Sequence, residues 1–280
     1  YDEASAALVS TFDLVTTPVV TGDSTLVSGT LSALYPHQWR HTSAVNTAYT
    51  YHSPRGEMRL WEGSQFDTRI THGGVLPSLP NLGRYNPETL RAFVRDAASE
   101  TLGTGPSYEN GKAMGRFANL VHIADQMDMT AERDHFLSQL KNRLEEWLSA
   151  GGAQQYMYNA AWDVLTGYPS GYGADDQIND HSFHSGYAIM AAATVAMYDP
   201  AWAAPDQWGG MVNLLIKDSN NWDRTDTQFP FLRGHAAYAG HSWAAGHGDF
   251  GDGNNQESSS ESMHFAAATL LWGAVTEQPE

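Results

Sequence analysis

Three acidic side chains stand in two segments whose residue types suit acid/base chemistry. Glu257 and Glu261 are four residues apart in the run 256–261, directly after a loop rich in Gly and Asp. If a helix begins within the serines of this run, Glu257 lies at its start and Glu261 one turn inside, both on the same side. The third acid, Asp180, lies upstream among histidines and aromatic residues. Acids brought together from separate segments, amid aromatic rings, are what acid/base hydrolysis of a sugar bond requires.

Asp180 has a structural explanation as well as a chemical one. A carboxylate at a helix entry can serve only as an N-cap, and Asp180 with His184 would share one side of a helix that opens here. A cap has no need of the polar and ring-bearing neighbours His181, Phe183 and Tyr187. This surrounding composition favours a catalytic or binding role for the segment.

The two glutamates also have a structural explanation, because acids in the first turn of a helix favour its dipole. The segment before them argues for more. His241 and Trp243 stand among residues too small to bury them, in the run 240–246. Loops that present one ring and a few polar groups suit a ligand site.

Composition narrows the classes of partner. The chain has 280 residues, 41% of them hydrophobic, with a formal net charge of -17, which argues against nucleic acids and anionic membranes because both would repel it. A neutral polymer would feel no such repulsion, and 9 Trp and 13 Tyr offer flat platforms for sugar faces. No cysteine is present, which excludes disulfides and thiolate zinc sites, and no apolar run is long enough to span a bilayer. Residues 1–5 do not have the pattern of a signal peptide.

Histidines are frequent enough for a metal site to be considered. The possible sets share loose spacing, and neither matches the zinc-protease helix with two histidines and a glutamate. We therefore expect no metal and no other cofactor. The two sets are Asp180 with His181 and His184, and Asp249 with His235, His241 and His247.

The elements that must position these residues change in kind along the chain. Runs rich in β-branched residues predict strands over 8–12, 15–20, 28–35 and 55–63, and 73–80 reads as a stiff connector. After that the periodicity predicts helices. The first begins at Asn86-Pro87 and packs through Leu90, Phe93, Val94 and Ala97. A second helix is expected over 110–126, with Phe117, Leu120, Val121 and Ala124 on one face. A third is expected from 131 to about 151, with Phe136, Leu140, Leu144, Trp147 and Leu148 on its packing face. Three more are expected over 181–197, 211–217 and 257–271.

A series of short strings runs along nearly the whole chain. They are residues 34–39, 74–77, Tyr108 with Gly111 and Lys112, 179–187, 199–202, 229–233, 240–244 and 255–261. In their sequences and their order they resemble glycoside hydrolase family 81, the endo-β-1,3-glucanases.

The resemblance implies a metal-independent, inverting hydrolysis of internal β-1,3-glucosidic bonds in laminarin, curdlan or fungal wall glucan. On this chain the general acid would be Asp180 and the base that activates water would be Glu257, with Glu261 as the third carboxylate. The resemblance assigns the two segments more firmly than the choice between the two glutamates. The residues expected to bind glucan are Tyr108, Lys112, His181, His184, Tyr187, His241 and Trp243.

The resemblance also implies a partial chain of α+β class, mainly α. Residues 1–50 would be the end of a β-sandwich, 51–85 a linking subdomain, and 86–280 a helical (α/α)6-type catalytic domain whose barrel stops early. The expected partners are β-1,3-glucan and the remainder of a longer parent chain, and the expected location is outside the cell. Two alternatives stay open: a non-catalytic glucan-binding fragment, or another (α/α)6 polysaccharide-degrading enzyme. A lyase for uronates would favour a cationic cleft, and only 15 residues are Lys or Arg.

Overall fold

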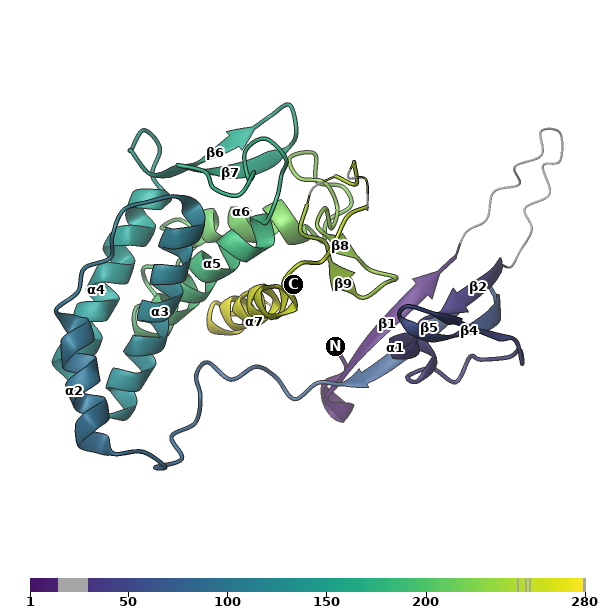
Figure 1. Ribbon diagram of the computed structural model, residues 1–280, viewed down its shortest axis with the longest axis horizontal. Coiled ribbons are helices and arrows are strands. Elements are labelled where there is room, and N and C mark those ends of the chain that lie inside the picture. Colours follow the sequence, from purple (N-terminus) through teal and green to yellow (C-terminus); the bar gives the residue numbers. More distant parts are fainter. Residues whose placement is uncertain (15–29, 246, 250, 252, 279–280) are drawn as a thin grey trace. The chain divides into compact units, whose positions relative to one another are not determined.

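The structure is a computed structural model that describes residues 1–14, 30–245, 247–249, 251 and 253–278. It divides into two units, which are considered separately (Figure 1). The first unit comprises Tyr1–Gly74 with Tyr238–Gly240, and the second comprises Val75–Ala237 with His241–Glu280. The strand predicted over 15–20 lies outside the described residues.

The first unit is built from antiparallel strands. One ladder pairs β1 with β5, and a second sheet has the order β2-β4-β3. The strands predicted over 8–12 and 55–63 are confirmed as β1 and β4, and the described end of the one predicted over 28–35 is β2. The bounds are η1 (Glu3–Ser5), β1 (Ala7–Asp13), β2 (Thr30–Leu34), α1 (Pro36–Trp39), β3 (Thr50–Ser53), β4 (Gly56–Gly63) and β5 (Gln65–Thr71).

A small aromatic core holds the first unit together. Trp61 and Phe66 are buried, and Phe12 stacks on Phe66 with ring centroids 4.8 Å apart. Tyr238 packs edge-on against Phe12 and donates its hydroxyl to a backbone carbonyl of β2. Burial of each such ring stabilises the unit by roughly 1.5–3 kcal/mol.

The second unit is mainly helical. Its helices are joined by loops and by two short hairpins, β6-β7 and β8-β9, which the sequence pattern did not predict. The bounds are α2 (Pro87–Ala98), α3 (Ser107–Gln126), α4 (Thr130–Trp147), β6 (Gln155–Asn159), β7 (Val164–Tyr168), α5 (His181–Tyr198), α6 (Gly209–Asn220), β8 (His235–Ala236), β9 (His241–Ser242) and α7 (Ser259–Val275).

Helix α2 begins where the sequence predicts it. The Asn86 side chain accepts a hydrogen bond from the backbone N–H three residues on, at 3.0 Å, and Pro87 fills the first helical position. Val94 and Ala97 are buried as predicted. Phe93 was predicted on the same packing face and this is wrong, because its side chain is 65% exposed. It lies about 100° around the helix from Val94, beyond the narrow buried stripe.

Helices α3 and α4 form the best-predicted part of the core. Phe136, Leu140, Leu144 and Trp147 recur at helical spacing along α4 and are all buried. Phe117 of α3 meets Phe136 edge-on, with ring centroids 5.3 Å apart. Helix α3 begins three residues earlier than predicted, and this extension brings Ser107 and Tyr108 onto the helix.

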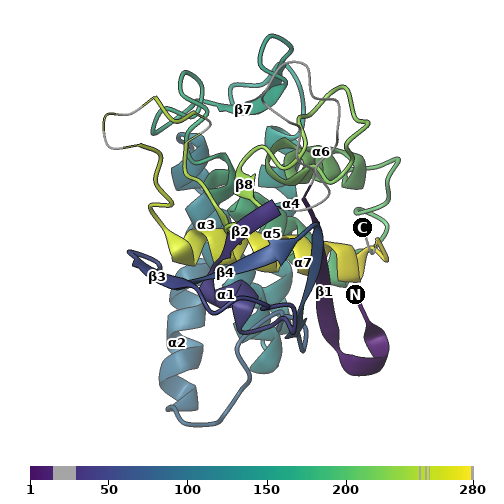
Figure 2. The ribbon, with the colours of Figure 1, turned by 90° about the vertical axis from the view of Figure 1, so that its right-hand side faces the viewer.

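Helix α5 lies in the interior of the second unit and consists largely of small residues. A Cβ on Gly186 would come within 3.0 Å of the Phe265 Cα on α7, and a Cβ on Gly115 of α3 within 2.8 Å of the Tyr187 ring. Glycine at both positions therefore allows α5 to approach its two neighbours closely. Figure 1 and Figure 2 show α7, in yellow, beside α5.

The predicted fold class is confirmed, because strands come first and a predominantly helical part follows. Within the described residues the second unit has six helices, α2 to α7, half of the twelve in a complete (α/α)6 barrel. In the part of the chain that the structure describes, no helix combines the length and apolarity needed to cross a bilayer.

Candidate active site

Asp180 stands at the N-cap position of α5 but does not cap the helix. Its backbone is left-handed, with φ 58° and ψ 19°, and its carboxylate accepts no capping hydrogen bond. The backbone is held in this conformation because its N–H donates to Ala244 O at 2.8 Å and its carbonyl accepts the His184 N–H at 2.9 Å. Oδ2 accepts a hydrogen bond from Asn179 at 3.1 Å, while Oδ1 is buried with no partner among the described residues. The simple capping explanation for Asp180 is therefore wrong.

The surroundings of Asp180 favour its protonated form. Burial is the largest cause, followed by the negative charges of Glu257 and Glu261, and together they raise the pKa of Asp180 to about 7. The neighbouring His181 opposes this rise. Asp180 therefore carries a proton through much of the range in which an ordinary aspartate is ionised, as a general acid must.

Glu261 has the opposite environment. The hydroxyls of Tyr108 and Tyr187 both donate to its Oε1 at 2.9 Å. Burial acts to raise the pKa of Glu261, but the two tyrosines, the Ser258 hydroxyl and the charge of Lys112 outweigh it and lower that pKa. Burial, followed by the hydrogen bond to Glu261 and the charge of Glu261, raises the pKa of Tyr108 to about 12. Glu261 is thus a fixed negative charge.

Glu257 lies just outside the helix that the sequence predicted to include it. The first residue of α7 is Ser259, and Ser258 is the N-cap, accepting the Glu261 N–H at 3.3 Å. The Ser258 N–H donates to Gln256 O at 2.7 Å, closing a tight turn around Glu257, whose φ is 51°. Its side chain is exposed, and its carboxylate accepts no hydrogen bond from any described residue. This glutamate is therefore open to solvent, in contrast to Glu261.

One backbone segment ties the two acidic segments together. Ala244 accepts the Asp180 N–H through its carbonyl and donates its own N–H to Asn255 O at 2.9 Å. The predicted binding residues His241 and Trp243 precede Ala244 and pack edge to face, with ring centroids 4.6 Å apart. They are thus connected to the carboxylates through the backbone.

A group of rings lies beside the carboxylates. Tyr108 is the centre of this group, with ring centroids 5.2 Å from His184, 6.2 Å from Tyr187 and 5.0 Å from Tyr172. Lys112 completes the group with its ammonium 5.2 Å from the Tyr108 ring. Of the predicted residues, the structure thus brings Tyr108, Lys112, His184 and Tyr187 together around the acids.

Tyr172 belongs to this group of rings and was not among the residues predicted from the sequence. Its ring is 60% exposed, and its backbone has a left-handed φ of 56°. The Asn179 side chain holds its carbonyl at 2.9 Å, next to Asp180. The strain of this conformation, set between Gly171 and Gly173, is of the kind that clusters at functional sites. The Gly-Tyr-Gly sequence was the available signal.

His184 is a neutral ring in the wall of the site. Its Nδ1 lies 2.8 Å from the Ser107 hydroxyl, and burial lowers the pKa of His184 to about 4. Its Nε2 is buried with no partner among the described residues. The imidazole can therefore offer a hydrogen bond from a protein pocket without carrying a charge.

The His181 ring lies in a different environment from the one predicted. Its Nδ1 lies 2.7 Å from Asp218 Oδ2 and its Nε2 lies 2.6 Å from Ala174 O, and the ring is buried. Both nitrogens are therefore engaged by the protein, which leaves neither for a sugar hydroxyl. Among the described residues, no three His, Asp or Glu side chains converge as a metal site requires.

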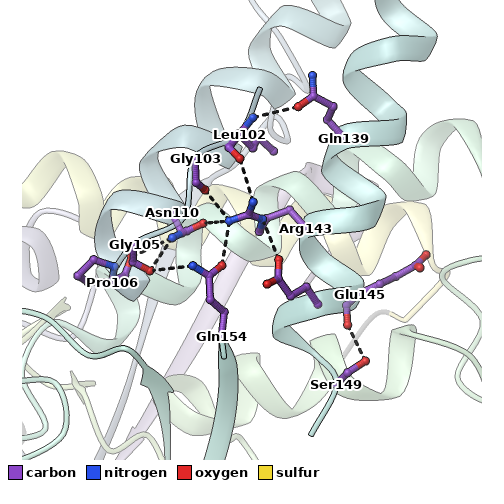
Figure 3. A network of polar contacts seen from close by, with 11 residues as sticks. Leu102, Gly103, Gly105, Pro106, Asn110, Gln139, Arg143, Glu145, Ser149 and Gln154 are labelled. Carbon is purple, nitrogen blue, oxygen red and sulfur yellow. Dashed lines mark hydrogen bonds and ion pairs between the residues drawn. The ribbon is translucent and has the colours of Figure 1, made fainter. Parts of the chain in front are cut away.

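A polar network on α4 anchors the start of α3, which carries Ser107 and Tyr108. Arg143 donates to Gly103 O, to Asn110 Oδ1 and to Gln154 Oε1 at 2.5–2.8 Å (Figure 3). The loop before α3 is thus fixed by side chains from α4 and from the segment just before β6. Such support keeps the Tyr108 hydroxyl in place against Glu261.

The sequence of the chain is similar to those of several glucan endo-1,3-beta-D-glucosidases. Residues 88–280 match the glycosyl hydrolase family 81 C-terminal domain. A glucan endo-1,3-beta-D-glucosidase of Thermobifida fusca is 48% identical over 286 aligned residues, covering 100% of this chain and 37% of the relative. The enzyme of the same name from Acetivibrio thermocellus is 44% identical, covering 99% and 36%. The chain thus spans little more than a third of these relatives.

The structure leads to the same family. A solved structure of a mutant glycoside hydrolase family 81 protein from Clostridium thermocellum matches with a TM-score of 0.92 and 42% identity, covering 99% of this chain and 39% of that one. The match includes the segments that bring Asp180, Glu257 and Glu261 together. With nearly all of its residues accounted for in this way, the chain belongs to glycosyl hydrolase family 81.

Proposed function

We propose that this chain is the catalytic part of an endo-acting β-1,3-glucanase that cleaves its substrate with inversion. One observation carries the proposal: a buried carboxyl with a pKa raised to about 7, Asp180, is coupled to two glutamates of contrasting environment. The names of the relatives support the substrate class, since they are glucan endo-1,3-beta-D-glucosidases.

Asp180 would act as the general acid. It holds its proton near neutral pH, and among the described residues only its Oδ2 has a hydrogen-bond partner, Asn179. Transfer of this proton accompanies cleavage of the bond between the anomeric carbon and that oxygen. The leaving sugar departs as an alcohol, and Asp180 is left as a carboxylate.

Glu257 would act as the base. Its carboxylate is exposed and unengaged by described residues, so it can take a proton from a water that attacks the anomeric carbon from the opposite face. Glu261 is less suited, because two tyrosine hydroxyls already occupy its Oε1. Glu261 would instead keep Asp180 protonated through its fixed charge. An acid and base separated by roughly 6.5–9.5 Å leave space for that water.

The rings around the carboxylates would hold the glucan. Glucose units are neutral, so the net charge of -17 does not repel them, and tyrosine and tryptophan faces suit the apolar faces of sugar rings. We assign this role to Tyr172 in addition to Tyr108, Tyr187 and Trp243. A polymeric substrate of this kind lies outside cells, which supports an extracellular location.

The test is the release of reducing ends from laminarin. Asp180→Asn should abolish turnover while glucan binding persists, because only the transferable proton is lost. Glu257→Ala should also be inactive, and azide should restore cleavage by replacing the missing base and water. Glu88→Ala, at an exposed first-turn glutamate of α2, is the matched control and should be fully active.

Each outcome of this test discriminates between the candidate functions. Full activity of Asp180→Asn would remove that residue from the mechanism. A parent chain that binds laminarin but releases no reducing ends would favour the non-catalytic glucan-binding alternative. Cleavage of uronate polymers with formation of a double bond would favour the lyase alternative.

A further inference from the structure

A buried network of charged groups includes the residue that follows Asp180 in the chain. It consists of His181 on α5, Asp218 on α6 and Arg233 in the loop after α6. Asp218 is 3% exposed and His181 is 8% exposed. Buried charges are costly unless they are paired, so a group of three at this position calls for an explanation.

The hydrogen bonds determine where the protons lie. Ala174 O only accepts, so the His181 Nε2 that lies 2.6 Å from it carries a proton. Asp218 Oδ1 accepts the Leu165 N–H at 2.8 Å and Arg233 Nη2 at 2.5 Å. Burial acts to raise the pKa of Asp218, but the charges and hydrogen bonds of His181, Arg233 and Leu165 lower it.

A carboxylate that accepts this many donors remains ionised. The proton between Asp218 Oδ2 and His181 Nδ1, 2.7 Å apart, therefore belongs to the ring. In this arrangement both ring nitrogens are donors, Nδ1 to Asp218 and Nε2 to Ala174, as they are in an imidazolium. The first position of a helix disfavours a cation, which makes the Asp218 carboxylate necessary to hold one there.

We propose that His181, with its two ring nitrogens donating to Asp218 and Ala174, is a positioning residue that limits the pH range over which Asp180 can donate its proton. His181 follows Asp180 directly in the chain, and its ring is locked at both nitrogens, which fixes the start of α5 and thus the strained backbone of Asp180. Its positive charge opposes the two glutamates, so that Asp180 can release its proton once the sugar oxygen has begun to accept it.

The charges facing these groups come from several elements. Glu257 and Glu261 act on Asp180 from the segment at the start of α7 and raise its pKa, while His181 lowers it. His184, one turn further along α5, is kept neutral by burial and by the His181 charge. On the other side, the phenol of Tyr156 of β6 has a raised pKa through burial and the charge of Asp218. His181 and Arg233 are the cations of the buried network, and of the two His181 is the one that adjoins Asp180 in the chain.

The inference rests on the proposed role of Asp180, and its test uses readouts that do not require hydrolysis. Nitrogen-15 NMR of the histidine rings in the parent chain reports whether His181 carries protons on both nitrogens at neutral pH. Carbon-13 NMR of the carboxyl groups follows the titration of Asp180. The expected result for the parent chain is a doubly protonated ring.

The informative variant is Asp218→Asn, which keeps the shape and the acceptor for Leu165 while removing the charge. His181 should become singly protonated, and the titration midpoint of Asp180 should move to higher pH by about half a unit or more. Asp199→Asn is the matched control, since it removes an ion-paired carboxylate at the other end of α5 and should leave the Asp180 midpoint unchanged.

A neutral His181 ring in the parent chain would overturn the proposal without any variant. An Asp180 midpoint that stays in place or falls in Asp218→Asn, although His181 has lost its charge, would also overturn it. If the expected shift occurs while laminarin is not hydrolysed, the proposed function fails and the charge coupling stands. Where hydrolysis is measurable, the alkaline limb of the kcat/KM profile should follow the same shift.

Discussion

Native Asp180 keeps its proton above the ordinary pKa of an aspartate, so it should lower the free energy of unfolding near neutral pH. Replacement by Asn should remove this loss. The native-state pKa is about 7 against an ordinary value of 3.8, so between pH 4 and 7 the unfolded chain releases this proton while the native state retains it. Stability therefore falls as the pH rises through this window. A difference of about three units corresponds to about 4 kcal/mol, and solvent screening at the open side of the site reduces it to about 2 kcal/mol.

Calorimetric unfolding of the second unit at pH 4, 6 and 8 measures this effect. Asp180→Asn should match the parent chain at pH 4 and exceed it at pH 8 by about 2 kcal/mol, or about 4–8 °C in Tm for a unit of this size. Asn tolerates the left-handed backbone at this position, so the substitution adds no strain.

Asp199 provides a control of opposite sign. Hydrogen bonds from Lys141 and from backbone N–H groups lower the pKa of Asp199, so its contribution is present at neutral pH and is lost as the pH falls. Asp199→Asn should therefore be less stable than the parent chain at pH 8 and approach it at low pH. The reasoning about Asp180 would be refuted if Asp180→Asn were the less stable protein at pH 8, or if its advantage did not depend on pH.

Further predictions concern the rings and the core. Tyr108→Phe and Tyr187→Phe each remove one hydrogen bond from Glu261, so each should raise its pKa and lower kcat on laminarin by about tenfold or more, with a double variant that is less than additive. Equal kcat in the parent and both variants would contradict this role. Phe136→Ala should cost about 3–5 kcal/mol of unfolding free energy because the ring is fully buried, whereas Phe93→Ala should change it by less than about 0.5 kcal/mol. Urea unfolding measures both, and equal losses would contradict the burial pattern.

Local patterns in the sequence predicted what local physics controls. The Asn86 cap and the stripe from Phe136 to Trp147 depend on residues within one helix, and both are confirmed. The helix predicted over 181–197 is confirmed as α5. The prediction that Phe93 is buried was wrong because helical spacing alone does not show how wide the buried stripe is.

The contacts that distinguish the three acids could not be read from the sequence. Tyr108 and Glu261 are separated by 153 residues, and nothing near either one indicates that they meet. Asp218 likewise lies in a part of α6 for which the sequence predicted no functional role, although its carboxylate contacts the His181 ring. Sequence composition identified the two acidic segments, but the different environments of their three acids depend on long-range packing.

The most direct test of the central claim is the configuration of the first sugar released from laminarin. An attacking water activated opposite the protonated Asp180 must invert the β-linkage, so proton NMR should show the α-anomer before mutarotation mixes the two. A first product with the β-configuration would contradict the account, because it would require a covalent intermediate that this assignment of Asp180 and Glu257 does not provide.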